Sequence, residues 1–305
     1  MVFNVEGAMA EVVSPTVARR RVRFALREAR ESMGKTQLEV AEEMEWSLSK
    51  VIRIENGDVS ISPNDLRPLL AYLGVKDRAR VSALISDAKI ARTRAHVSWW
   101  QEPRFRDLSD ALKRYFEYES VATAIRSYSI RYIPGPLQLS EYASALTGSL
   151  DDELDEGLIN QIVDARRVRR ESFISRLGKP LAYYTVLDEA VFMRSTGGAV
   201  SFAKQLSDML ELASNGLIHI RMLPFSLNVP IANNASFDLL SLGDPSGGNE
   251  VLYRENGVAD ELIEEPLATS RHLRRFNKLW QVAATEADTI RFIGDRIDLL
   301  EHGRQ

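Results

Sequence analysis

Small polar and cationic residues gather in one short segment near the N-terminus, at the start of a predicted helix. From residue 47 the segment reads S-L-S-K-V-I-R-I-E-N-G. Serine hydroxyls can bond to several base edges, and an arginine fork fits the O6 and N7 acceptors of guanine in the major groove. We therefore predict that base-edge contacts come from Ser47, Ser49, Lys50 and Arg53.

Residues around this segment could hold the phosphate backbone. The run A-R-R-R-V-R-F-A-L-R-E-A-R from residue 18 predicts a helix whose polar surface is rich in arginine. Phosphate contacts would set the register of the protein on DNA but not its sequence preference. An ordinary solvated helix face remains the alternative for any one of these arginines. The candidates are Arg19, Arg20, Arg23, Arg27, Lys35, Thr36, Gln37 and Asn56.

A second set of polar and aromatic residues could form a ligand or partner site in the C-terminal half. It combines aromatic walls, a loop kinked by I-P-G-P-L-Q from residue 133, and arginine forks suited to carboxylate or phosphate. The alternative is that the aromatic residues are core and the arginines form a solvated helix face. The candidates are Tyr118, Glu119, Tyr128, Pro134, Gln138, Arg166 and Arg170.

Metal and nucleophilic chemistry have little support. The chain has four histidines and no cysteine, and it lacks H-E-x-x-H, G-x-x-x-x-G-K-[ST] and G-x-S-x-G. We expect His219 to be a packed residue of a strand. The glycines at 243, 247 and 248 are typical of a hairpin turn.

Paired carboxylates are the remaining catalytic possibility. Asp188 with Glu189, or Glu250 with Glu255, could perform acid and base chemistry. Exposed carboxylates at the ends of strands and helices are commoner. We therefore expect no enzyme, no metal and no cofactor.

Composition limits the class of protein. A length of 305 residues favours about two domains, and 45% hydrophobic residues suit a globular core. The net charge of −4 means that any nucleic-acid contact comes from a local patch. The sequence has no cysteine, no export signal and no apolar run near the ~20 residues that span a bilayer. These features favour a location in the cytoplasm.

The segment before the candidate base contacts has the signals of two short helices. Thr36 followed by Glu39 is a capping-box pattern, and Ser47 can cap the next helix. Val51 and Ile54 would be buried, and Gly57 would end the helix in a left-handed conformation. Further helices from about residue 17, from residue 62 and over residues 76–92 would complete a five-helix bundle.

T-Q-x-x-x-A followed by S-x-S-x-V-x-R-I-E-N-G resembles the XRE helix-turn-helix family over roughly residues 17–73. The resemblance implies DNA binding by the second helix of the pair. An αα-hairpin in an unrelated helical protein is the alternative. We expect a leader at residues 1–13, a DNA-binding domain at 14–95 and a C-terminal domain at 96–305 for effector sensing, partner binding or dimerisation.

The C-terminal half mixes helical and extended patterns. We expect helix over residues 108–126, at 141–145 and through residue 176 after the acidic run D-D-E-L-D-E, and again at 200–214 and after Pro266. Strands are predicted at 181–187, 217–223, 237–242 and 250–254. The chain is therefore predicted to be mainly α with a smaller α+β part, having helices on one side of a short, largely antiparallel sheet.

This half is similar to a domain of unknown function found behind XRE modules in actinobacterial regulators, including WhiJ-like proteins. The ordered motifs are Y-E-S-V-A-T-A-I-R-S-Y, I-P-G-P-L-Q-L-S-E-Y-A, A-R-R-x-R-R, V-L-D-E-A-V, R-M-L-P-F and V-L-Y-R-E, within about residues 99–281. The resemblance implies developmental or antitoxin-like transcription control, often with a small neighbouring partner protein. Pro136, Leu139 and Glu171 depart from the family pattern, so any specificity carried there can differ.

The sequence thus predicts a transcription regulator, homodimeric on a palindromic operator, whose C-terminal domain binds an effector or a small partner protein. Double-stranded DNA is the predicted partner, and no membrane contact is expected. The alternatives are a DNA-tethered interaction scaffold and an enzyme domain fused to a DNA-binding module.

Overall fold

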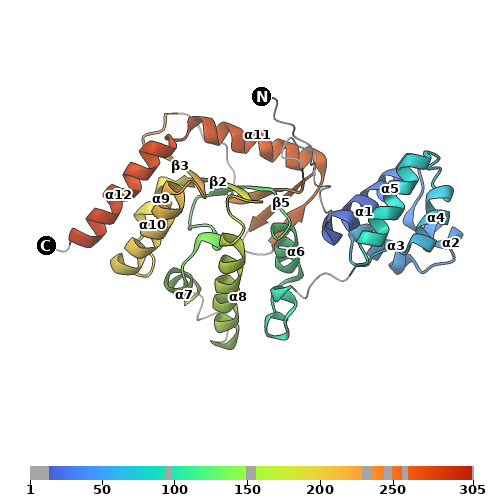
Figure 1. Ribbon diagram of the computed structural model, residues 1–305, viewed down its shortest axis with the longest axis horizontal. Helices are drawn as coiled ribbons and strands as arrows, with labels where there is room; N and C mark the ends of the chain where they lie inside the picture. The colour runs from blue at the N-terminus through green and yellow to red at the C-terminus, as the bar shows by residue number, and fades with distance from the viewer. Residues whose placement is uncertain are drawn as a thin grey trace, which may run out of the picture. The chain divides into compact units, whose positions relative to one another are not determined.

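The computed structural model describes residues 14–93, 98–148, 156–228, 235–243, 249–255 and 260–303. These residues fall into two compact units, one within Met1–His96 and the other within Val97–Gln305 (Figure 1). The predicted leader at 1–13, the acidic residues 151–155 and the glycines at 247 and 248 lie outside the described residues.

The N-terminal unit is a bundle of helices, each begun by a polar cap. Its helices are α1 (Pro15–Ser32), α2 (Gln37–Glu43), α3 (Leu48–Asn56), α4 (Pro63–Tyr72) and α5 (Arg78–Ile90). The side chain before each helix accepts a hydrogen bond from a backbone N–H of its first turn, which satisfies a donor that has no partner within the helix. The caps are Ser14, Thr36, Ser47, Ser62 and Asp77.

One apolar core joins these helices. Val22 and Leu26 of α1 meet Val51 and Ile54 of α3 there. Gly57 ends α3 with φ +83°, and a Cβ at this position would lie 2.9 Å from Cδ of Arg23. The glycine therefore provides both the left-handed turn and the space in which the Arg23 stem packs.

The C-terminal unit is a mixed α/β assembly. Its helices are the 3₁₀ turns η1 (Trp99–Gln101), η2 (Pro103–Phe105) and η3 (Gly135–Leu137), and α6 (Asp110–Glu119), α7 (Ser140–Gly148), α8 (Glu156–Ile174), α9 (Glu189–Met193), α10 (Ala199–Ser214), α11 (Pro266–Val282) and α12 (Glu286–His302). Its strands are β1 (Ala124–Ser129), β2 (Ala182–Asp188), β3 (His219–Leu223), β4 (Phe237–Ser241), β5 (Glu250–Glu255) and β6 (Asp260–Ile263).

The strands form one six-stranded sheet in the order β3-β2-β1-β4-β5-β6. The β3-β2-β1 part is parallel, whereas β1, β4, β5 and β6 pair antiparallel. The predicted α+β class is confirmed, with a larger and mixed sheet. The four predicted strands are present, with ends that differ by one or two residues.

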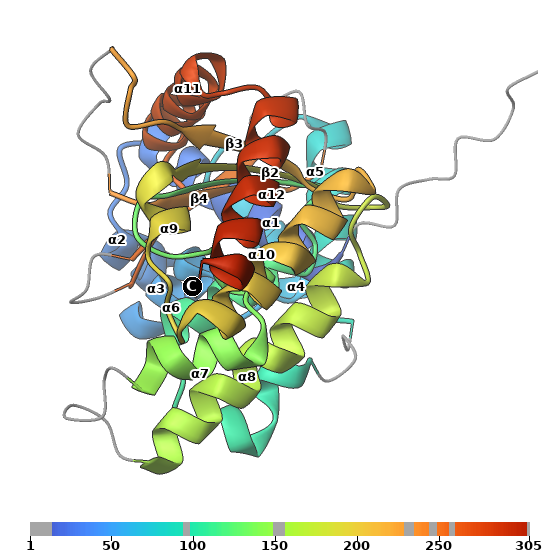
Figure 2. The same ribbon diagram turned by 90° about the vertical axis from the view of Figure 1, so that its left-hand side faces the viewer.

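Helices cover both faces of the sheet, so the expectation of helices on one side is wrong. Tyr128 and Leu239 pack against Phe276 of α11 on one face. On the other face, Tyr115 of α6 bonds to Asp238 and Phe173 of α8 meets the ring of Tyr183. Figure 1 shows α11 on one side of the sheet and α6 and α8 on the other. Beyond β3, α12 packs along α10 (Figure 2).

The prediction of helix over residues 108–126 is wrong beyond Glu119, because β1 occupies Ala124–Ser129. This strand is central in the sheet and is buried on both faces, so its sequence lacks the alternation of a half-buried strand. The short edge strand β6 was not predicted either.

Candidate nucleic-acid interface

A buried carboxylate holds α1, α2 and α3 together. Glu55, near the end of α3, is only 4% exposed. Its Oε1 accepts from Nε of Arg30 at 2.6 Å, and its Oε2 accepts from the Arg30 Nη2 at 2.9 Å and from the Gln37 amide at 2.8 Å. The hydrogen bonds that Arg30 donates to the Glu55 carboxylate raise the pKa of Arg30. The angle of α3 to the other two helices is therefore set by charge-assisted bonds as well as by apolar packing.

The turn between α2 and α3 positions Lys50. Glu45 has φ +53°, and this left-handed residue turns the chain between the two helices. The Nζ of Lys50 lies 3.7 Å from the centre of the Trp46 ring and 3.4 Å from Oδ2 of Asp65. The Lys50 ammonium group therefore lies against the bundle, where it contacts the Trp46 ring and the Asp65 carboxylate at the start of α4.

The predicted base-edge residues share the N-terminal part and the open side of α3. Ser47, Ser49 and Arg53 are exposed, and Lys50 is half-buried. The Ser47 Oγ caps the helix by accepting from the Lys50 N–H, which leaves its hydroxyl proton to donate. Within the described residues the Arg53 guanidinium makes no hydrogen bond or ion pair. Of the two predicted base-reading cations, Arg53 is the one whose donors are all available among the described residues, because Lys50 donates to Asp65.

The predicted phosphate residues before and after these helices are mostly engaged. Thr36 and Glu39 form the predicted capping box at the start of α2. Backbone and side-chain hydrogen bonds from Thr36 and Lys35 lower the pKa of Glu39 to about 2. The Gln37 amide bonds to Glu55, whereas Asn56 is exposed at the end of α3.

The arginines of α1 have different surroundings, which the sequence pattern did not distinguish. Arg20 and Arg23 are only 6% and 5% exposed, and both guanidinium groups lie against the Phe24 ring. The expectation that they lie on an open helix face is therefore wrong. Arg27 is half-buried and donates to the Glu55 carbonyl oxygen.

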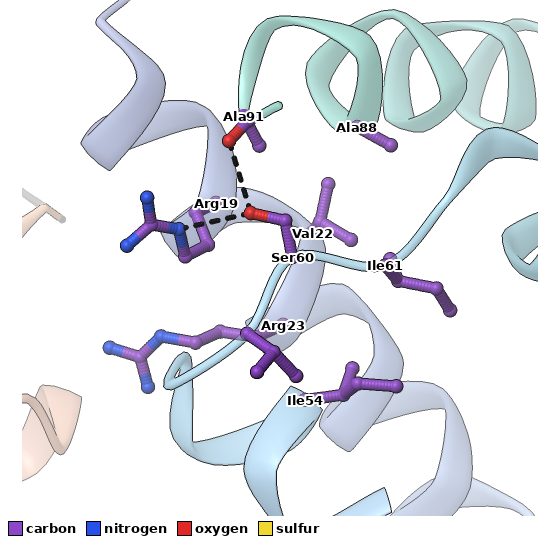
Figure 3. Close-up of a pocket in the computed structure, with 9 residues that line it drawn as sticks. Arg19, Val22, Arg23, Ile54, Ser60, Ile61, Ala88 and Ala91 are labelled. Atoms are coloured by element: carbon purple, nitrogen blue, oxygen red, sulfur yellow. Dashed lines mark hydrogen bonds between the residues drawn. The ribbon is translucent and has the colours of Figure 1, made fainter. Parts of the chain in front are cut away.

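Arg19 belongs to a polar contact that joins three segments of the bundle. Its Nε donates to Oγ of Ser60 at 3.3 Å, and that hydroxyl donates to the Ala91 carbonyl oxygen at 3.0 Å (Figure 3). The hollow beside these residues has a volume of about 10 Å³, roughly the space of one water. It is a packing defect of the core and offers no ligand site.

The C-terminal candidate residues are not brought into one site. Arg166 donates to Oγ1 of Thr147, and Arg170 donates to Oδ1 of Asp208 and to the Leu137 carbonyl oxygen. Gln138 donates to the Ile133 carbonyl oxygen. These bonds hold the chain around η3 against α7, α8 and α10, and Pro134, the residue before η3, is buried.

The other three candidates have separate structural roles. Glu119 accepts two hydrogen bonds from Arg169, an arginine that sequence reasoning passed over. The Tyr118 hydroxyl donates to Oε1 of Glu264. Tyr128 lies in the core on the α11 face of the sheet, where burial raises its pKa to about 12.

The opposite face of the sheet carries a buried polar cluster, defined here as Tyr115, Glu119, Arg169 and Asp238. The Tyr115 hydroxyl donates to Oδ2 of Asp238 at 2.8 Å, and burial raises the pKa of both groups. Burial opposes the charge of Arg169, but Glu119 and Tyr115 raise its pKa well above the usual value. This cluster orders α6 and α8 on the sheet.

Other site classes find no support among the described residues. They contain no group of three or more histidine, cysteine, aspartate or glutamate side chains that could hold a metal. Within the same residues no helix has the length and apolar character needed to cross a bilayer.

Each half of the chain matches a known family model. A family model described as "Helix-turn-helix domain" matches residues 22–84, which include α2, α3 and the predicted base-reading residues. A second model, described as "Domain of unknown function (DUF5753)", matches residues 112–295. Comparisons with curated proteins and with solved structures returned no match. The DUF5753 match extends over more than half of the chain, so the protein belongs to the DUF5753 family and carries a helix-turn-helix domain before it.

Proposed function

We propose that this protein is a sequence-specific DNA-binding transcription regulator of the cytoplasm, and that α3 enters the major groove. The observation that carries the proposal is the unpaired guanidinium of Arg53 beside Ser49 on the open side of α3. Glu55 anchors the same helix from within the bundle. A fixed helix with a free arginine fork is the arrangement that reads guanine.

We further propose that the protein binds a palindromic operator as a homodimer. A single helix-turn-helix module buries only roughly 600–1,000 Å² of protein surface on DNA, which is small for tight specific binding. Two copies on half-sites one helical turn apart would double that surface. Dimerisation is assigned to the C-terminal unit.

The test is selection of fragmented genomic DNA by the purified full-length protein at low and moderate salt. We expect a palindromic motif whose enrichment persists as salt rises, and a protein-to-DNA ratio of two by mass photometry. Binding that is independent of sequence and vanishes with salt would contradict the proposal, because this is the behaviour of phosphate contacts alone.

The regulatory input is proposed to be a small partner protein, in the antitoxin-like manner that the family resemblance implies. Arg166 and Arg170, which were predicted to bind an effector, are already bonded to groups of their own unit. This favours a partner protein over a small molecule held by these two arginines. No catalytic role is assigned to the unit. Co-expression with the small protein encoded by a neighbouring gene should give a stable complex by size-exclusion chromatography. Separate elution at micromolar concentration would refute this assignment.

A further inference from the structure

A basic depression lies between α4 and α5 on the surface of the N-terminal unit. Its volume is about 400 Å³, within the range of small-molecule sites. None of the residues predicted to contact DNA takes part in it. It is lined by Arg67, Lys76, Arg78, Val81, Ser82, Ile85, Ser86 and Lys89.

The charge of this basic depression is of one sign. Arg67, Lys76, Arg78 and Lys89 surround it, and no carboxylate is among the lining residues. Within the described residues none of these four cations forms an ion pair or a hydrogen bond. The chain as a whole has a net charge of −4, so the local excess of positive charge is not a consequence of composition. Four like charges around one hollow attract an anion strongly.

Helix geometry strengthens this attraction at one end. Arg78 is the first residue of α5, where the positive end of the helix dipole disfavours a cation. Asp77 caps the helix through the N–H groups of Ala79 and Arg80, so it is already engaged. Arg78 and Lys76 lie beside the N-terminus of α5, and their positive charges there destabilise the helix. An anion bound at this end would offset that destabilisation.

The depression is elongated along one face of α5. From Arg78 to Lys89 the helix rises by ~16 Å at 1.5 Å per residue. Between these cations lie Val81 and Ile85, which form an apolar floor, and Ser82 and Ser86, whose short side chains leave room and can donate hydrogen bonds. A ligand here would turn negative charge toward these cations and would rest on the apolar floor between them.

We propose that this basic depression binds an elongated small polyanion with two or more phosphate groups, such as a nucleoside polyphosphate. The DNA backbone is a poorer occupant. The α5 helix packs against α1 and α4, whereas α3 packs against α2 and α1, and a hollow of about 400 Å³ suits a small ligand better than a duplex. The DNA-binding unit would then carry its own effector site, separate from the C-terminal unit.

The test is isothermal titration of the full-length protein with inorganic tripolyphosphate at physiological ionic strength. We expect saturable one-to-one binding, and at least a tenfold rise in Kd for the Lys76→Gln/Arg78→Gln double variant. Lys89→Gln alone should raise Kd about threefold to tenfold. The control is Arg92→Gln, which removes an exposed arginine of the same unit that does not line the depression. Circular dichroism would check that each variant is folded.

Three results would overturn the proposal. One is no binding of tripolyphosphate at millimolar concentration, and another is an equal loss of affinity in the control variant. The third separates the ligand from DNA. If the double variant lowers the salt slope of DNA binding by about two and leaves the affinity for tripolyphosphate unchanged, the depression is part of the DNA contact and not an effector site.

Discussion

Loss of the buried Glu55 carboxylate should loosen α3 within the bundle. The Glu55→Gln variant keeps the shape of the side chain but removes the charge that faces Arg30 and turns an amide donor toward its guanidinium. Removing one partner of a buried ion pair costs ~3–5 kcal/mol. Arg30 keeps its bond to the Lys35 carbonyl oxygen at 2.9 Å, and its side chain is 12% exposed. We therefore expect a loss of ~2–4 kcal/mol in the free energy of unfolding of the N-terminal unit.

A second carboxylate on the same arginine provides the control. Glu31 lies 3.5 Å from the Arg30 Nη2, and its side chain is 61% exposed. An exposed pair contributes ~0–1 kcal/mol, so Glu31→Gln should have little effect. Both variants keep Arg30. Glu55→Gln removes a buried charge and also alters the contact with the Gln37 amide, whereas Glu31→Gln removes an exposed charge.

Amide hydrogen exchange of the full-length protein, followed by mass spectrometry, localises the effect. Peptides that cover α1, α2 and α3 should exchange ~30–1,000-fold faster in Glu55→Gln, which is the rate equivalent of 2–4 kcal/mol. Peptides from the sheet should not change. If Glu55→Gln and Glu31→Gln have equal effects, the reasoning that a buried charge network orients α3 is refuted.

Three further predictions concern helix ends and a second buried ion pair. Gly57→Ala should cost more than the ~1–2 kcal/mol of a left-handed alanine, because the new Cβ would lie 2.9 Å from Arg23. The control Gly34→Ala, with φ +64° and no atom within 4 Å of the new Cβ, should cost only that amount. Urea denaturation of both variants measures the difference, and equal midpoints would contradict it. Arg169→Met leaves Glu119 buried without its partner and should cost ~3–5 kcal/mol or unfold the C-terminal unit. The side chain of Arg167 is 47% exposed, so the control Arg167→Met should cost less than ~1 kcal/mol. Thermal melting compares the two variants, and similar Tm values would refute the assignment of a buried ion pair to Arg169 and Glu119. The pKa of Glu39 is lowered to about 2 from its usual 4.5, so its stabilising effect is complete above pH 4.5 and is lost as the pH falls through 2. Carboxyl-carbon NMR should give that midpoint, and Glu39→Gln should remove the contribution of this one group to the pH dependence of stability. A midpoint near 4.5 would contradict the capping-box account.

Local signals in the N-terminal unit were sufficient to predict its helices. Thr36 with Glu39, Ser47 and Gly57 act on backbone groups within one turn of the chain, so their spacing alone carries the structure. The burial of Glu55 could not be predicted in this way. A glutamate in a helix is usually exposed, and its partner Arg30 is distant in the sequence and meets it only when the bundle has formed.

In the C-terminal unit the sequence pattern was less informative about positions in the core. The strand β1 is covered on both faces, and its buried Ser127 and Tyr128 interrupt any apolar run. The arginine cluster of α8 posed a similar difficulty. Arg169 reaches the buried carboxylate of Glu119, while Arg167 faces solvent, and sequence spacing does not say which side of α8 meets the sheet.

The central claim is that α3 reads DNA bases through Arg53. The most direct measurement is a competition titration of the selected operator against random DNA, with the wild type, Arg53→Ala and the Arg92→Ala control. We expect Arg53→Ala to lose ~1–3 kcal/mol of discrimination, which is about fivefold to 150-fold in the affinity ratio, and Arg92→Ala to keep the wild-type ratio. An unchanged ratio in Arg53→Ala would contradict the claim that this helix specifies the operator.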